Sequence, residues 1–142
     1  MWSLNKRVDA RQVEQAIREA ERATTGEIRV SVAHFFWGNV PKVAARAFRK
    51  LGMERTTEHN GVLIFLVPSR RRFVVLGDSG IHAVVGQAFW DEVAACLGGY
   101  FQRGEFTEGL LAGIHLLGVR LAEHFPAGAS ERNELGDEVD FR

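Results

Sequence analysis

The chain has 142 residues, which is enough for one domain with a substantial core and too few for two ordinary domains. Its 18 basic and 18 acidic residues give a formal net charge of zero, which argues against nucleic-acid binding through a strong overall positive field. The single cysteine, Cys96, excludes an intramolecular disulfide and a metal site built from several cysteines. The N-terminal stretch MWSLNKRVDARQ lacks the apolar core of a signal peptide, and no helical stretch is long enough to span a bilayer. We therefore expect a cytoplasmic protein.

The first half of the chain alternates helical and strand patterns. Apolar residues recur at helical spacing over 9–24, alternate over 27–34 in EIRVSVAH, and return to helical spacing over 41–51. The continuous apolar run VLIFLV at 62–67 is typical of a strand that is buried on both faces. This order predicts a strand, a crossover helix and a second strand parallel to the first.

The second half begins with a predicted hairpin. The turn PSRRR is followed by the strand pattern of 73–78, which should pair antiparallel with 62–67. Two helices follow, one marked by Phe89, Val93, Cys96 and Tyr100, and one capped by Thr107 and ended by Pro126. The prediction is therefore a single layered α/β domain over 1–126 with a mixed sheet. Residues 127–142 carry five acids and are expected to form a flexible acidic tail.

The predicted strand directions place polar residues at one end of the sheet. The exit of 73–78 lies beside the entries of the other two strands, so Asp78 and Ser79 should lie near Glu27 and Asn60. Glu54 and Glu58 fall in a loop close to the same end. We call this end the Asp78 rim.

Three interpretations of Gly-Asp-Ser-Gly at 77–80 remain open. A nucleophilic Ser79 would need a base such as His59 within hydrogen-bond reach, and nothing in the spacing requires one. A hard cation such as Ca²⁺ or Mg²⁺ would take oxygen ligands, for which Asp78, Asn60, Glu27 and Glu54 are the candidates. The third interpretation is structural, in which Asp78 caps a turn or helix start and Asn60-Gly61 shapes a loop.

Several short motifs occur in a fixed order along the chain: Gly-Glu-Ile at 26–28, Leu-Gly-Met at 51–53, Asn-Gly-Val-Leu at 60–63, Gly-Asp-Ser-Gly-Ile at 77–81, Phe-Trp at 89–90 and Phe-Pro at 125–126. Over about residues 9–126 this set resembles the TPM domain family. The resemblance implies a three-layer α/β/α sandwich around a mixed sheet of about four strands, with the remaining strand from 81–85 or the N-terminus. Asp78 is the position that transfers best, whereas His59 stands where the family pattern implies an arginine.

Family members have heterogeneous functions, so the resemblance supports two hypotheses. The first is divalent-cation binding at the Asp78 rim, with weak metal-assisted phosphatase activity of the acid-phosphatase type implied by the family alone. The alternative is a non-catalytic protein-interaction module that acts in the assembly or repair of a larger complex. Its contact surface would be the aromatic stretch at 34–38 or the arginines at 70–72. Neither hypothesis involves nucleic acid or an integral membrane segment.

Overall fold

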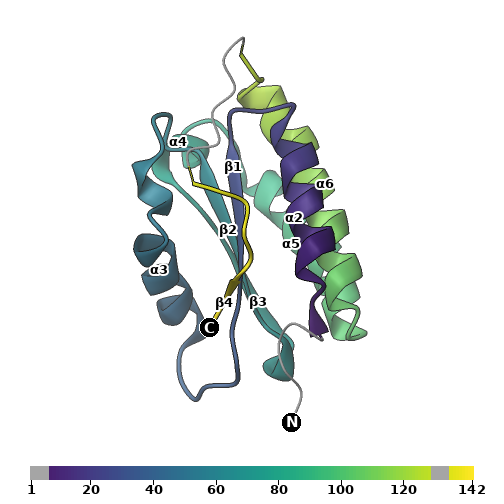
Figure 1. Ribbon diagram of the computed structural model, residues 1–142. Helices are drawn as coiled ribbons and strands as arrows, with labels where there is room; N and C mark the ends of the chain where they lie inside the picture. The colour runs from purple at the N-terminus through teal and green to yellow at the C-terminus, as the bar shows by residue number, and fades with distance from the viewer. Residues whose placement is uncertain (1–6, 129–134) are drawn as a thin grey trace.

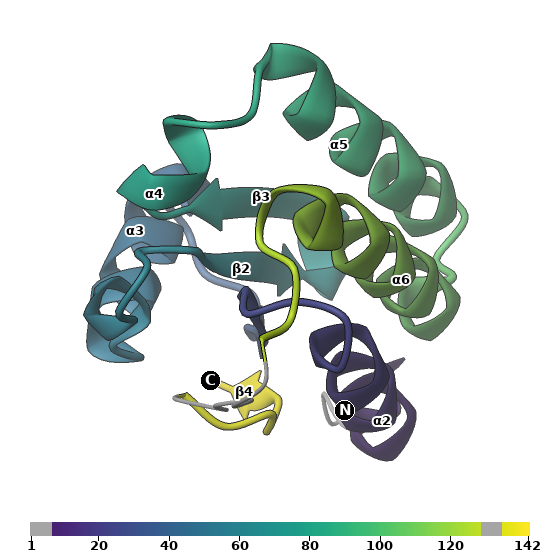
Figure 2. The same cartoon turned by 90° about the horizontal axis from the view of Figure 1, so that it is seen from above.

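The computed structural model describes residues 7–128 and 135–142. In these residues a four-stranded mixed sheet of order β3-β2-β1-β4 has α3 on one face and α2, α5 and α6 on the other (Figures 1 and 2). The predicted three-layer α/β/α sandwich is confirmed. The helices and strands in chain order are α2 (Ala10–Glu21), β1 (Glu27–Val32), α3 (Val40–Lys50), η1 (Met53–Arg55), β2 (Gly61–Val67), η2 (Pro68–Arg70), β3 (Arg72–Gly77), α4 (Ser79–His82), α5 (Gln87–Gln102), α6 (Phe106–His124) and β4 (Asp140–Phe141).

The central strand β2 is buried along its whole length, as its continuous apolar sequence predicts. Successive side chains of a strand point to opposite faces. Val62, Ile64 and Leu66 therefore join the core beneath α2, α5 and α6, whereas Phe65 joins the core beneath α3. β1 runs parallel to β2 and β3 runs antiparallel to it, so the predicted strand directions are correct.

The helices pack closely because small residues lie at their contacts. A Cβ atom on Gly118 of α6 would lie 2.7 Å from the Cβ of Ala20 on α2, closer than two non-bonded carbon atoms can approach.

α2 and α3 each begin with a side-chain cap: Asp9 accepts from the Gln12 amide and Asn39 from the Lys42 amide. Thr107, the predicted cap of the last helix, instead accepts a hydrogen bond from the Asp9 amide at 3.0 Å and so links α6 to the start of α2.

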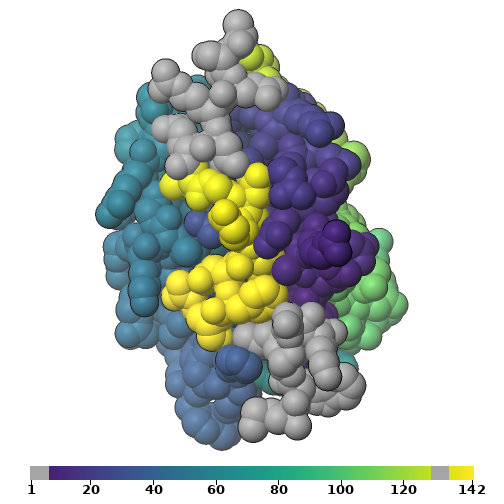
Figure 3. Space-filling model, viewed as in Figure 1, coloured from purple at the N-terminus to yellow at the C-terminus, as the bar shows by residue number. Residues whose placement is uncertain are grey.

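The C-terminal residues correct two predictions. Residues 135–142, here called the C-terminal segment, do not form a flexible tail but lie along β1 between the α2 and α3 sides of the molecule (Figure 3). β4 pairs in parallel with β1, and the fourth strand therefore comes from the C-terminus rather than from 81–85 or the N-terminus. Val139 is buried in the main core, which is why this short polar segment has a defined position. The rest of the predicted tail, 129–134, lies outside the described residues.

Candidate functional site

The backbone of the Asp78 rim has the predicted arrangement. Glu27 of β1 pairs with Gly61 of β2, and Gly77 of β3 pairs with Val62 next to it. The Asp78 amide donates to the Gly61 carbonyl at 3.0 Å. One end of the sheet therefore brings together the start of β1, the start of β2 and the exit of β3.

The Asp78 side chain lies in a polar setting at this rim. Its Oδ1 accepts from the Ser79 amide at 2.8 Å and caps the short helix α4. Its Oδ2 lies 3.2 Å from His59 Nδ1, and the side chain is 13% exposed. The interpretation of Asp78 as a helix cap is thus confirmed for Oδ1. The other carboxylate oxygen, Oδ2, faces the exposed side chain of His59.

Backbone oxygens gather beside Asp78 because the chain passes unusually close to Gly80. A Cβ atom on Gly80 would clash with the carbonyl oxygens of Glu58 and His59, so only glycine fits there. The Gly80 amide donates to the His59 carbonyl at 2.8 Å. His59 itself has a left-handed backbone conformation with φ of 51°, which turns the 58–60 backbone toward Gly80. Two carbonyl oxygens therefore lie against Gly80, two residues after Asp78.

Asn60 and Glu27, two other predicted ligands, direct their side chains elsewhere. Both residues are 1% exposed. The Asn60 Nδ2 donates to the Thr25 hydroxyl at 3.2 Å, and the Glu27 Oε1 accepts from the Leu135 amide at 2.7 Å. Both side chains thus have structural hydrogen bonds, and that of Glu27 holds the C-terminal segment.

Glu54, the fourth predicted ligand, is exposed on η1. Across 7–128 and 135–142, no three side chains of His, Cys, Asp or Glu are placed to hold a metal ion. A cation at the Asp78 rim would therefore depend on Asp78, backbone carbonyls and water. Ser79 is exposed, and His59, the base that was considered for it, contacts Asp78, which gives no support to the nucleophile interpretation.

A partly buried acidic pair, Glu21 and Asp137, lies near the start of β1. The Glu21 carboxylate accepts from the Ile28 amide at 2.9 Å, at an edge of β1 that β4 does not reach. Burial, followed by a hydrogen bond with Asp137 and the charges of Asp137 and Glu27, raises the pKa of Glu21 to about 9. Sequence reasoning missed this pair because Asp137 belongs to the segment that was expected to be flexible.

The fold and the rim define a class of protein: a single α/β/α domain with a mixed sheet and a polar site at the turn after its antiparallel edge strand. The chain belongs to the TPM domain family, whose model matches residues 5–119. The resemblance inferred from the short motifs is therefore confirmed.

Three solved structures show how widely this fold is shared. The BA42 protein of the psychrophilic bacterium Bizionia argentinensis is 33% identical, with a TM-score of 0.91 over 100% of this chain and 97% of that one. The N-terminal domain of the cg2496 protein from Corynebacterium glutamicum is 16% identical, with a TM-score of 0.64 over 87% of this chain and 77% of that one. An N-terminal domain of a P. gingivalis protein is 19% identical, with a TM-score of 0.61 over 82% and 76% of the two chains. The last two similarities show the fold alone.

Two searches gave no match. No curated protein shows significant similarity to the chain. Among the residues that the structure describes, no helix combines the length and the apolarity needed to cross a bilayer.

Proposed function

We propose that this TPM domain binds a hard divalent cation, Ca²⁺ or Mg²⁺, at the Asp78 rim. The observation that supports the proposal is the convergence of the Glu58 and His59 carbonyl oxygens on Gly80, next to the Asp78 carboxylate. Hard cations prefer carboxylate and carbonyl oxygens, and both ions accept water in the remaining positions. The residues present therefore fit such an ion, although the ligand set differs from the four predicted side chains.

The ligand chemistry sets the expected affinity. With one acidic side chain and neutral carbonyls, the site carries little negative charge, so we expect a dissociation constant of about 10⁻⁴–10⁻³ M or weaker. Calcium is the better fit to an irregular set of oxygens, because magnesium demands near-ideal octahedral geometry. The proposed role is thus that of a weak cation-responsive module.

Phosphatase activity is the second part of the proposal and rests on family membership. A bound cation would polarise a water molecule for attack on a phosphate ester. The chain's own contribution would be Asp78 as ligand and His59, 3.2 Å from that carboxylate, as the group that holds a proton. We expect any such activity to be weak, since among the residues that the structure describes no Lys or Arg side chain contacts Asp78 to stabilise a phosphoryl group.

The Asp78→Asn variant tests cation binding with the fold preserved. Asparagine can still accept the Ser79 amide and cap α4, so stability should change little, whereas loss of the charge should remove cation binding. Asp78→Ala should lose both binding and about 0.5–2 kcal/mol of stability through the cap. The measurement is an amide NMR titration with CaCl₂ and with MgCl₂, in which wild-type shifts should centre on 58–61 and 77–80.

A matched variant on the same loop sharpens the test. His59→Asn keeps a residue that tolerates positive φ and removes the side chain that competes for Asp78, so it should strengthen cation binding. Glu54→Gln serves as the control for general loss of negative charge. Wild-type amide signals that do not move at millimolar cation, or that move equally in Asp78→Asn, would refute the proposal.

A further inference from the structure

The zero net charge of the chain hides an uneven distribution of charge. The sequence has no Asp or Glu between Glu27 and Glu54 and none between Glu58 and Asp78. These two acid-free stretches supply most of β1 and all of α3, β2, η2 and β3. They contain eight Lys and Arg residues: Arg29, Lys42, Arg46, Arg49, Lys50, Arg70, Arg71 and Arg72. The compensating acids lie elsewhere in the chain, so this part of the molecule is basic.

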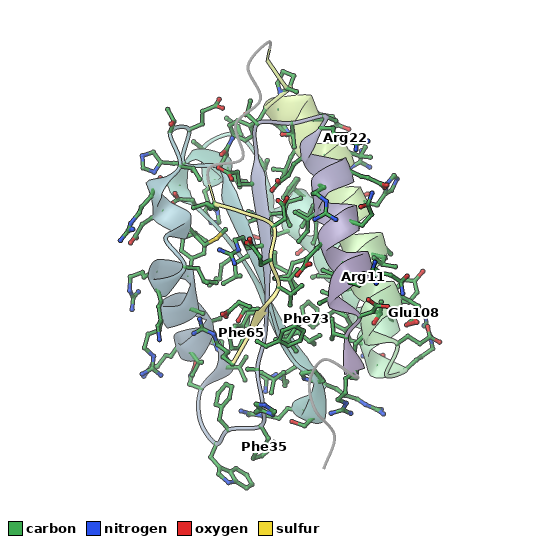
Figure 4. All side chains as sticks on the ribbon, viewed as in Figure 1. Arg11, Arg22, Phe35, Phe65, Phe73 and Glu108 are labelled. Atoms are coloured by element: carbon green, nitrogen blue, oxygen red, sulfur yellow. The ribbon has the colours of Figure 1, made fainter. Side chains whose placement is uncertain are left out.

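An aromatic loop projects from the basic part at the exit of β1. Trp37 is 90% exposed and Phe35 is 47% exposed, whereas Phe36 between them packs against the core beneath α3. Phe35 lies at the end of the molecule opposite the Asp78 rim (Figure 4). The Phe35 and Trp37 rings contact each other edge to face, with centroids 4.8 Å apart. The loop thus presents two large aromatic side chains to solvent.

Arg70 of η2 holds this loop in place. Its Nη1 donates to the carbonyl oxygens of Phe36 and Gly38, both at 3.0 Å. Its guanidinium also lies 5.9 Å from the Phe35 ring centroid and 5.6 Å from that of Phe36. The aromatic stretch and the arginine hairpin, which the sequence presents as alternative contact surfaces, therefore form one surface, here called the aromatic tip (Phe35, Trp37 and Arg70).

Further basic side chains flank the aromatic tip. Arg71 and Arg72 follow Arg70 directly, and Lys42 lies in the first turn of α3, where its amide is bound by Asn39. All three residues are exposed. The acids Asp140 and Glu105 on other elements are already paired, with Arg142 and Arg103 respectively. The tip therefore combines exposed aromatic rings with uncompensated positive charge.

We propose that the aromatic tip docks on the surface of an anionic lipid bilayer. Tryptophan and phenylalanine favour the headgroup region, and each adjacent Lys or Arg adds attraction to anionic lipid. The tip is a projecting loop, so it can enter a headgroup layer without a matching pocket in the partner. A protein partner would need such a pocket, and a nucleic acid would meet a chain whose formal net charge is zero. This contact is peripheral and is independent of the cation proposal.

Vesicle flotation tests the proposal. The wild-type chain should float with phosphatidylcholine vesicles that contain phosphatidylglycerol, and should not float with phosphatidylcholine alone or at high salt. Phe35→Ala/Trp37→Ala and Arg71→Glu/Arg72→Glu should each lower the partition coefficient at least about tenfold. Trp37→Phe should still bind but should lose the blue shift of tryptophan fluorescence that vesicles induce in the wild type.

Matched variants on a distant face control for general effects. Val119→Ala removes an exposed apolar side chain from α6, and Arg11→Glu reverses a charge on α2. Both should bind vesicles like the wild type. Absence of binding to anionic vesicles at low salt overturns the proposal, as does equal loss in the control variants. Binding of polyglutamate or RNA without binding of vesicles also overturns it and assigns the tip to an acidic macromolecule.

Discussion

Raising the pH from 5 to 9 is expected to destabilise the protein through Glu21. The pKa of Glu21 rises from an ordinary 4.5 to about 9 in the folded protein, because the carboxyl is buried and hydrogen-bonded to Asp137. Between these values the folded state binds more protons than the unfolded state, so the free energy of unfolding falls as pH rises. The expected slope approaches about 1.4 kcal/mol per pH unit, and the contribution is fully present below the unfolded pKa. Urea unfolding at several pH values measures it.

Glu21→Gln isolates this effect. The amide can still accept from the Ile28 amide and can donate to Asp137, but it does not ionise. The variant should show a flat profile over this pH range and should be more stable than the wild type at pH 9. Glu19→Gln, an exposed change on the same helix, should leave the slope as it is in the wild type. If the free energy of unfolding of Glu21→Gln falls with pH as steeply as that of the wild type, another group causes the pH dependence.

The parts of the fold that follow from local pattern were predictable. The apolar run of β2 indicated a doubly buried strand, and the crossover helix and hairpin determined the directions of β1 and β3. These directions in turn placed Asp78 beside Gly61 and Glu27 at one end of the sheet. Backbone proximity at the rim could therefore be read from sequence.

Side-chain directions at the rim could not be read in the same way. Asn60 and Glu27 were expected to face Asp78, but their partners are Thr25 and Leu135. The Leu135 contact spans 108 positions of sequence and belongs to a segment without apolar periodicity. Likewise, the close approach of the 58–59 carbonyls to Gly80 depends on the left-handed backbone of His59, which no sequence pattern indicates.

The aromatic loop shows the same limit at the other end of the sheet. HFFWG has no period that separates rings packed beneath the loop from rings exposed to solvent. Only Phe36 packs in this way, 6.5 Å from the Phe65 ring centroid, because the chain turns outward after β1. The exposure of Phe35 and Trp37 thus depends on the path of the loop, which Arg70 holds from another element.

Ending the chain at residue 134 is expected to destabilise the domain by at least about 4 kcal/mol, from the two terms that follow. Loss of Val139 removes a buried side chain from the main core, worth about 1.5–3 kcal/mol. Glu27 loses the hydrogen bond from the Leu135 amide, and Arg29 loses its hydrogen bonds to the Leu135 and Glu138 carbonyls, each worth about 1 kcal/mol. The edge of β1 also becomes open to pairing with other chains.

Two point variants separate these contributions. Val139→Ala should account for about 1–2 kcal/mol through lost packing, whereas Glu138→Gln should have little effect, since that side chain is exposed and its carbonyl supplies the contact. Urea unfolding gives the free energies, and sedimentation detects association through the open edge. A truncated chain as stable as the full one would mean that residues 135–142 detach freely in solution, as a mobile tail would. The expected result is the full predicted decrease in the free energy of unfolding for the truncation and a smaller decrease for Val139→Ala. That result would establish that the last eight residues complete the sheet and shield Glu21 and Glu27 from solvent.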